Sequence, residues 1–252
     1  MVILWLRYGA ASTEIMNNVL IAQSQNQPII PSGVVGYWSG NEYSGTKLRD
    51  YSGNNNDGTI TGCTYVPGNK GSALNFDGLG TNYIDCGTAS ACNFTTTNFT
   101  IMFWIKPTTL NHTSGKDYQP VWLANGGYET GGYYLQDQGN GTGFSLITNQ
   151  AGSGKHQFVI SNNGYLVIGV WKHLTFLRNG AVGTLYCNAV EVTGYVNHDA
   201  IVNPASAPNN LTIGHYPGDS SAYWYNGALD DIIMYNRALS VSEITTIYNG
   251  TK

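Results

Sequence analysis

The glutamates of this chain stand too far apart in sequence for the paired-carboxylate chemistry that cleaves glycosidic bonds. Retaining glycosidases hold two carboxyl groups about 5 Å apart, and one strand can supply both in a Glu-x-Asp-x-x-Glu pattern. The sequence contains no such run. Its glutamates therefore argue against glycoside hydrolysis. They stand singly, at Glu14, Glu42, Glu129, Glu191 and Glu243.

Nucleophilic catalysis has no better support in the sequence. There is no Gly-x-Ser-x-Gly elbow, and none of the histidines belongs to a catalytic signature. His173 follows Trp171 in a strand-like run, where we expect a half-buried, structural imidazole. We therefore predict that the protein is not an enzyme. The histidines are His112, His156, His173, His198 and His215.

Aromatic side chains are better candidates for a ligand site. Ring faces stack on the apolar faces of sugars, while amides and carboxylates bind the hydroxyl groups. Two loop-like segments are rich in such groups, and we expect part of them to serve packing instead, Tyr225 above all. The predicted ligand-binding residues are Trp122, Tyr128, Tyr133, Tyr216, Asp219 and Trp224, with Tyr134, Tyr223 and Tyr225 beside them.

Acidic and amide side chains in turn-like segments offer the hard oxygen ligands that calcium prefers. The alternative is that these side chains accept hydrogen bonds from neighbouring backbone amides in Asx turns. The sequence leaves both roles open, and either role is structural. The residues concerned are Asp50, Asn54, Asp57, Asp77, Asp230 and Asp231.

The composition argues against several classes of partner. The chain of 252 residues has a formal net charge of −4 and 11 Lys and Arg, with no basic run that could neutralise a phosphate backbone. No apolar run approaches the roughly 18 residues that a membrane-spanning helix needs. We therefore expect no nucleic-acid binding and no membrane span. Cys86 and Cys92 either close a short disulfide loop or stay free.

The chain is typical of short strands joined by tight turns. With 32 Gly, 18 Tyr and 10% charged residues, its composition favours strands over surface helices. The run Phe99–Pro107 is apolar on both faces except for Thr100 and Lys106 and ends at a proline, so we expect a strand in the middle of a sheet. One short helix is predicted over about residues 241–248, because Ser240 and Glu243 form a capping box and Gly250 can end it.

Nine short segments follow one another in a characteristic order along residues 33–250. They are Val34–Trp38, Asp50–Gly58, Ala73–Gly78, Tyr83–Ile84, Phe99–Ile105, Trp171–Phe176, Leu185–Asn188, Leu211–Gly214 and Asn226–Ser240. In this order they resemble the laminin-G-like jelly-roll family of the concanavalin A-like lectin/glucanase superfamily. The resemblance implies an all-β fold, a two-sheet antiparallel jelly-roll sandwich, over residues 33–252.

The resemblance also implies one structural calcium ion, because relatives hold calcium near the segment that corresponds to Ala73–Gly78 and near the last strand. Carried over to this chain, the metal ligands are Asp77 with Asp230 or Asp231. In one place the chain departs from the family. The family has an Asn-Gly turn where this chain has Asn188-Ala189, so the geometry of that turn is open.

Residues 1–32 differ from the rest and are predicted to form an anchoring arm. Met1–Leu6 is apolar, and Ile15, Met16, Val19 and Leu20 would share one face of a short helix. Left free, these groups would expose more apolar surface than a soluble monomer tolerates. We expect the arm to bind capsid or fibre subunits, and the protein to be a homo-oligomer.

These features lead to a first hypothesis, a non-catalytic virion surface protein, such as a head-decoration or fibre subunit, that displays a lectin-like domain. The short segment Arg7–Ala11 resembles phage structural proteins. Its ligand would be a glycan or a host-surface polysaccharide. A second hypothesis is a secreted or cell-surface bacterial carbohydrate-binding adhesion module, although the sequence shows no recognisable secretory leader. A glycoside hydrolase or its accessory module is the third.

Overall fold

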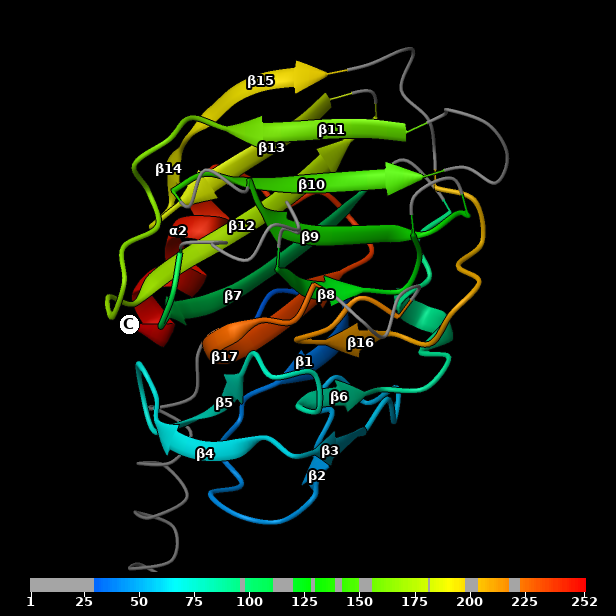
Figure 1. The fold of residues 1–252 in the computed structure, drawn as a ribbon. Coiled ribbons are helices and arrows are strands. Elements are labelled where there is room, and N and C mark those ends of the chain that lie inside the picture. Colours follow the sequence, from blue (N-terminus) through cyan, green and yellow to red (C-terminus); the bar gives the residue numbers. More distant parts are fainter. Residues whose placement is uncertain are drawn as a thin grey trace, which may run out of the picture. The chain divides into compact units, whose positions relative to one another are not determined.

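A computed structural model describes residues 30–95, 98–110, 120–127, 130–138, 142–149, 156–180, 182–197, 204–217 and 223–252. The chain divides into two compact units, Met1–Ile30 and Pro31–Lys252. Most of the predicted arm therefore lies outside the described residues. The described part is an antiparallel β-sandwich of two sheets, which confirms the predicted fold class (Figure 1).

One sheet has eight strands in the described part of the chain, in the order β14-β13-β12-β7-β17-β5-β4, with β1 also paired to β17. Its strands are β1 (Val34–Trp38), β4 (Thr64–Pro67), β5 (Ser72–Asp77), β7 (Phe99–Pro107), β12 (Lys172–Asn179), β13 (Val182–Cys187), β14 (Val190–Glu191) and β17 (Asn226–Tyr235).

The other sheet has nine strands among the described residues, in the order β15-β11-β10-β9-β8-β16-β6-β3-β2. They are β2 (Lys47–Leu48), β3 (Gly58–Thr61), β6 (Tyr83–Asp85), β8 (Val121–Ala124), β9 (Tyr133–Asp137), β10 (Phe144–Asn149), β11 (His156–Ser161), β15 (Thr193–Asn197) and β16 (Thr212–Ile213). A short 3-10 helix, η1 (Ser90–Cys92), follows β6.

Strand β7 lies between β12 and β17, as its apolar sequence predicts. Every residue from Phe99 to Ile105 is buried. Ile101, Phe103 and Ile105 point into the main core between the sheets, where Phe103 stacks on Phe176 with ring centroids 5.6 Å apart. Truncating such a fully buried ring to alanine typically costs 3–5 kcal/mol. All four cysteines are free thiols, and Cys86 and Cys92 are part of this core.

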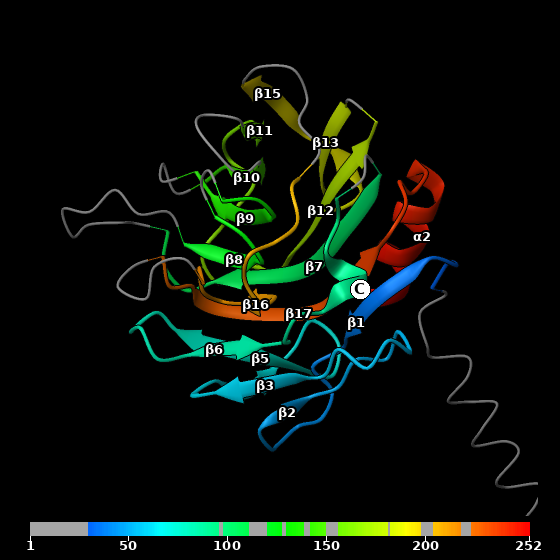
Figure 2. The ribbon, with the colours of Figure 1, turned by 90° about the vertical axis from the view of Figure 1, so that its right-hand side faces the viewer.

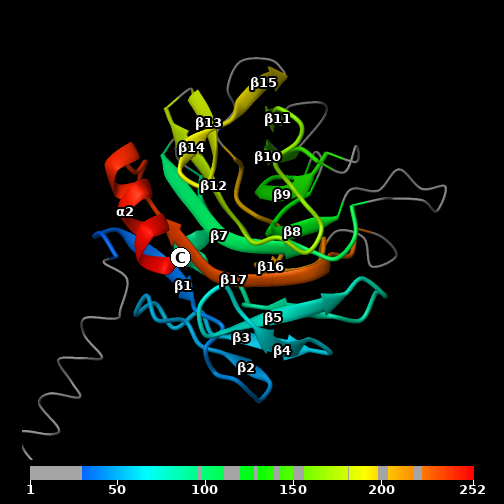
Figure 3. The ribbon, with the colours of Figure 1, turned by 90° about the vertical axis from the view of Figure 1, so that its left-hand side faces the viewer.

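The outer face of the eight-stranded sheet is covered by helix α2 (Val241–Thr251) (Figures 2 and 3). Tyr248 stacks on Trp104 of β7 at 5.6 Å, and Trp104 Nε1 donates a hydrogen bond of 2.9 Å to Thr251 Oγ1. This contact favours continuation of the helix through Gly250 to Thr251, so the predicted end near residue 248 was too early. No helix in the described ranges is long and apolar enough to cross a membrane.

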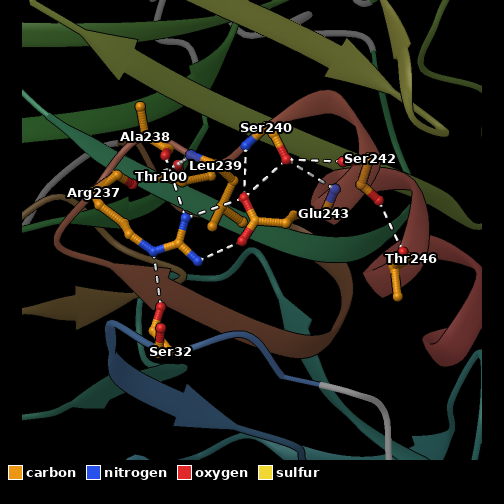
Figure 4. A network of polar contacts seen from close by, with 9 residues as sticks. All are labelled: Ser32, Thr100, Arg237, Ala238, Leu239, Ser240, Ser242, Glu243 and Thr246. Atoms are coloured by element: carbon orange, nitrogen blue, oxygen red, sulfur yellow. Dashed lines mark hydrogen bonds and ion pairs between the residues drawn. The ribbon is translucent and has the colours of Figure 1, made fainter.

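The predicted capping box is present at the start of α2 and is part of a larger network (Figure 4). Arg237 binds the two carboxylate oxygens of Glu243 at 2.6 and 3.1 Å, and its Nε donates to the carbonyl of Ser32 at 2.8 Å. The ion pair with Arg237 and the backbone amide of Ser240 lower the pKa of Glu243 to about 2. A single carboxylate therefore ties the start of the domain to its last helix.

Asp50 organises the loop between β2 and β3 and ties it to β1. Its Oδ1 accepts hydrogen bonds from the amides of Tyr37 and Ser52, and its Oδ2 accepts one from the amide of Asn56 at 2.9 Å. Asp57 in turn accepts the amide of Asp50 at 2.8 Å. Of the two roles that the sequence left open, calcium ligation and Asx turns, these contacts match the Asx turn, because backbone amides donate to both oxygens of the Asp50 carboxylate.

The hairpin between β13 and β14 contains the turn whose geometry the sequence left open. Cys187 pairs with Val190, and the two turn residues, Asn188 and Ala189, have φ values of 52° and 62°. Both residues are therefore in the left-handed region, as a type I′ turn requires. Asn188 tolerates this conformation, whereas an alanine in it is strained by its Cβ.

We therefore predict that Ala189→Gly stabilises the protein by about 1 kcal/mol, because glycine adopts this conformation without strain. Urea denaturation would show a higher midpoint at an unchanged slope. The matched control is Gly164→Ala, at another exposed turn with a φ of 95°, which should destabilise the protein. An unchanged or lower midpoint for Ala189→Gly would contradict the strained turn.

Candidate functional site

Strand pairing places one row of side chains on the outer face of the nine-stranded sheet. Leu146 of β10 pairs with Leu135 of β9 and with Val159 of β11, and all three point into the main core. The next row along the same strands is Tyr134, Ile147 and Phe158. Because neighbouring residues of a strand point to opposite faces, this row faces outward.

These outward residues form a second, smaller hydrophobic cluster. Tyr134 and Ile147 are buried there with Val121 and Ala124 of β8, and three further aromatic side chains pack against them. Tyr216 contacts Tyr134 edge-on at 5.7 Å and Tyr223 at 5.2 Å. The three packing rings, Phe158, Tyr216 and Tyr223, are only partly buried.

A second aromatic group is next to this cluster in sequence at His215, just after β16, and at Trp224, just before β17, and it includes Tyr83 on β6. His215 stacks on Trp224 with ring centroids 4.1 Å apart, and Tyr83 contacts both rings at 5.6 and 6.2 Å. Tyr83 and Trp224 are partly exposed. We call the two groups together the aromatic strip. It consists of Tyr83, Tyr134, Phe158, His215, Tyr216, Tyr223 and Trp224.

The backbone conformation before β17 directs three consecutive aromatic residues to two different sides of the sheet. Tyr223 has a φ of 68°, a conformation that costs an ordinary residue roughly 1 kcal/mol or more. Tyr223 and Trp224 lie on the aromatic strip, while Tyr225 turns into the main core and contacts Phe76 at 5.8 Å. The prediction that Tyr225 serves packing is therefore confirmed.

Two polar side chains of β10 face the same way as Ile147, namely Ser145 and Asn149, two residues before and after it. Both are fully buried. Among the described residues, the hydroxyl of Ser145 and both amide atoms of Asn149 have no hydrogen-bond partner. A buried polar group without a partner costs about 1–3 kcal/mol, so these atoms would gain hydrogen bonds from a ligand that displaced the groups covering them.

The structure separates the predicted ligand-binding residues. Tyr216 and Trp224 lie on the aromatic strip, and Tyr128 and Asp219 lie outside the described residues. Trp122 and Tyr133 were wrongly placed at the ligand, because their rings point into the main core between the two sheets, away from the outer face. Trp122 packs edge-on against Phe103, and the hydroxyl of Tyr133 donates to the carbonyl of Cys92 at 2.8 Å.

Sequence reasoning missed Tyr83, His215, Phe158, Ser145 and Asn149. A strand that is buried on both faces shows no alternation of apolar and polar residues, and β10 is such a strand. The sequence Phe-Ser-Leu-Ile-Thr-Asn therefore does not reveal which residues face outward. The available signal was the aromatic side chain of Phe158, which the structure places on β11 beside β10.

The predicted calcium ligands do not come together. Asp77 pairs with Asn226, which precedes Asp230 by four residues, or about 13 Å of strand. The Oδ1 atom of Asp77 accepts the amide of Leu79 in an Asx turn. Among the described residues no group of three acidic, histidine or cysteine side chains is arranged to hold a metal ion. The described residues therefore do not fit the calcium site that the resemblance implies.

Asp230 and Asp231 instead form a buried acidic pair in a β-bulge of β17. Asp230 accepts the amide of Asn69 at 2.9 Å through Oδ2, and its Oδ1 has no hydrogen-bond partner in the described part of the chain. Asp231 accepts the hydroxyl of Tyr37 at 3.1 Å. Burial, and then the charge of Asp231, raises the pKa of Asp230 to about 8. Burial raises the pKa of Asp231 to about 6.

We predict that Asp230→Asn stabilises the protein at pH 8, by on the order of 2 kcal/mol, and has little effect at pH 4. The pKa of Asp230 is higher in the folded chain than in the unfolded chain. The protonated carboxyl group of Asp230 therefore makes its full contribution to the free energy of unfolding below about pH 4, and this contribution is lost as the pH rises toward 8. Asparagine keeps the shape of the protonated acid and cannot ionise.

Urea denaturation at pH 4, 6 and 8 would test this, with Asp77→Asn as the control, because Asp77 lies in a partly exposed turn. The series is run both in EDTA and in millimolar calcium. If Asp230→Asn lost stability only in calcium, the carboxylate would be a metal ligand, and the account of Asp230 as a protonated acid would be wrong.

Comparisons with known proteins agree with the fold. No curated protein matches the chain in sequence. The binding domain of Paraclostridial Mosquitocidal Protein 1 superposes with a TM-score of 0.66 and 20% identity, over 86% of this chain and 52% of that one. Domain 4 of AbnA, an extracellular arabinanase of Geobacillus stearothermophilus solved with arabinotriose, superposes with a TM-score of 0.56 and 18% identity, over 85% of this chain and 98% of that one. Trypanosoma rangeli sialidase superposes with a TM-score of 0.59 and 18% identity, over 94% of this chain and 38% of that one.

The chain thus spans about half of the toxin binding domain and less than half of the sialidase chain. At these identities the similarity concerns the fold. The sequence itself, over residues 77–245, matches the laminin-G-type family model described as "Concanavalin A-like lectin/glucanases superfamily". That match covers most of the sandwich, and the chain belongs to the concanavalin A-like lectin/glucanase superfamily.

Proposed function

We propose that the domain is a non-catalytic glycan-binding module whose ligand binds along the aromatic strip. The observation that carries this proposal is the combination of partly exposed rings with unpartnered polar atoms on one sheet face. Trp224 and Tyr216 offer ring faces for the apolar side of a sugar, and Ser145 and Asn149 offer hydrogen bonds for its hydroxyls.

The fold comparison supports the same ligand class. Domain 4 of AbnA matches this chain over nearly its whole length and was solved with arabinotriose. A neutral oligosaccharide also suits the aromatic strip together with the uncharged side chains of Ser145 and Asn149 on the same sheet face. We therefore propose neutral oligosaccharides as the ligand class.

The proposed absence of catalysis rests on where the described glutamates lie. Glu42 accepts the amide of Arg49 in a loop, Glu191 belongs to β14 of the other sheet, and Glu243 is bound in the helix cap. None of these three lies on a strand beneath the aromatic strip. A carboxylate pair for hydrolysis is therefore not formed by the described glutamates.

We further propose that the module is displayed on a virion surface, as a head-decoration or fibre subunit, and that residues 1–32 attach it to capsid or fibre subunits. The apolar run Met1–Leu6 supports an attachment role, since roughly 600 Å2 of apolar burial would supply on the order of 15 kcal/mol before entropy costs. A secreted or cell-surface adhesion module is the alternative, and the toxin binding domain among the structural neighbours favours it.

The binding proposal predicts that Trp224→Ala weakens binding of an oligosaccharide by about tenfold or more, because one stacked ring is lost. A glycan array that includes arabinan fragments would identify a ligand, and titration calorimetry would measure the affinities. The control is Tyr43→Ala, which removes a ring that is 64% exposed but lies elsewhere. An unaltered affinity for Trp224→Ala would place the site elsewhere, and release of reducing sugar would contradict the lack of catalysis.

The attachment proposal predicts that deleting residues 1–30 leaves a folded domain that no longer assembles. This deletion keeps Ser32, whose carbonyl accepts the hydrogen bond from Arg237. Circular dichroism and thermal melting would report folding, and analytical ultracentrifugation would report assembly. If the truncated chain unfolded, or assembled like the full chain, the arm would not be the attachment segment.

A further inference from the structure

The turn between β11 and β12 lies at the left margin of the ribbon in Figure 1. It carries three exposed aliphatic side chains. Val167 is 42% exposed, Ile168 54% and Val170 43%. Single exposed apolar residues are normal on a protein surface, but three within four positions form a patch. We call these three side chains the apolar tip.

The apolar tip is held in a defined conformation. The amide of Val170 donates to the carbonyl of Val167 at 3.2 Å, which closes a β-turn with Gly169 at a φ of 72°. The amide of Gly169 donates to the carbonyl of Pro107 at 2.8 Å, which fixes the turn to the end of β7. Leu166, just before the tip, is buried in the main core. The exposure therefore belongs to a fixed turn that the sandwich holds on both sides.

Next to the apolar tip are an aromatic residue and two lysines, one from β12 and one from β7. Trp171 follows Val170 directly and is partly buried. The ammonium group of Lys106 lies 4.9 Å from the centre of the Trp171 ring. Lys172 is the first residue of β12 and pairs with Ile105, so it lies at the same end of the strands as Lys106 but on the opposite face of the sheet. Along the chain the three aliphatic residues are thus followed by a tryptophan and a lysine, and a second lysine lies over the tryptophan ring.

We propose that the apolar tip inserts into the surface of a phospholipid bilayer with anionic headgroups. The order of the groups matches the layers of a bilayer surface. Aliphatic side chains favour the acyl region, tryptophan favours the interface, and lysines bind headgroup phosphates with their stems along the apolar boundary. This contact would hold the domain at a membrane next to the glycans on the same surface, and it does not depend on the glycan site.

The observations favour a bilayer over a protein partner. A stable protein interface buries about 800 Å2 on each side, with a broad and complementary surface. The apolar tip is one turn with three aliphatic side chains, which is too small for that. A bilayer requires no complementary shape, and each lysine near an anionic surface strengthens binding by roughly fivefold.

The test is sedimentation of the full chain with vesicles of phosphatidylcholine, with and without phosphatidylserine. We expect binding to the anionic vesicles that weakens at high salt. Val167→Ser, Ile168→Ser and Val170→Ser combined should weaken it by about tenfold or more, and Lys106→Gln with Lys172→Gln should remove the preference for phosphatidylserine. The matched control is Val182→Ser with Val190→Ser, which changes valines that are 61% and 65% exposed elsewhere.

The vesicles carry no sugar, so this result is separate from glycan binding, and Trp224→Ala should sediment like the unaltered chain. Melting temperatures would verify that all variants are folded. The proposal is overturned if the full chain does not bind either kind of vesicle, or if the triple serine variant binds as well as the full chain. Self-association that the tip variant alone abolishes, without vesicle binding, would show a protein interface instead.

Discussion

The structure depends on the burial of β7 on both of its faces. A strand whose residues are apolar from Phe99 to Ile105, except for Thr100, can leave neither face to water, so it requires one layer inside and another outside. The nine-stranded sheet provides the inner layer, and helix α2 provides the outer one through Tyr248 and Thr251 against Trp104. The position of α2 at the end of the chain is therefore as much part of the core as the central strands.

The apolar outer faces of the two sheets are shielded from water by different kinds of groups. Helix α2 covers the eight-stranded sheet with residues that are themselves buried, such as Ile244 and Ile247. On the nine-stranded sheet, the covering groups described are aromatic rings, including Tyr216 and Tyr223, which stay partly exposed. A face closed by rings can exchange part of its cover for another flat, amphipathic molecule, whereas a face closed by a packed helix cannot do so without unfolding.

Local features could be predicted from the sequence, but the register in which neighbouring strands pair could not. Phe99–Pro107 and the capping box of Ser240 and Glu243 depend on residues a few positions apart, so pattern alone identified them. Trp122 and Tyr133 were misplaced because their strand pairs are apolar on both faces, and a shift of one residue exchanges core and surface. Whether Asp77 reaches Asp230 depends on which residue of β17 it opposes, and no local pattern contains that information.

The network around Glu243 has a consequence for the chain ends. Ser32 is bound to Arg237, and Lys252 ends a helix of 11 residues, so entry and exit of the domain are separated by little more than the length of α2, about 16 Å. Domains whose ends lie this close tolerate insertion into a loop of another protein, or circular permutation with a short linker. The sandwich is therefore a cassette that a longer polypeptide could host without rearrangement of its core.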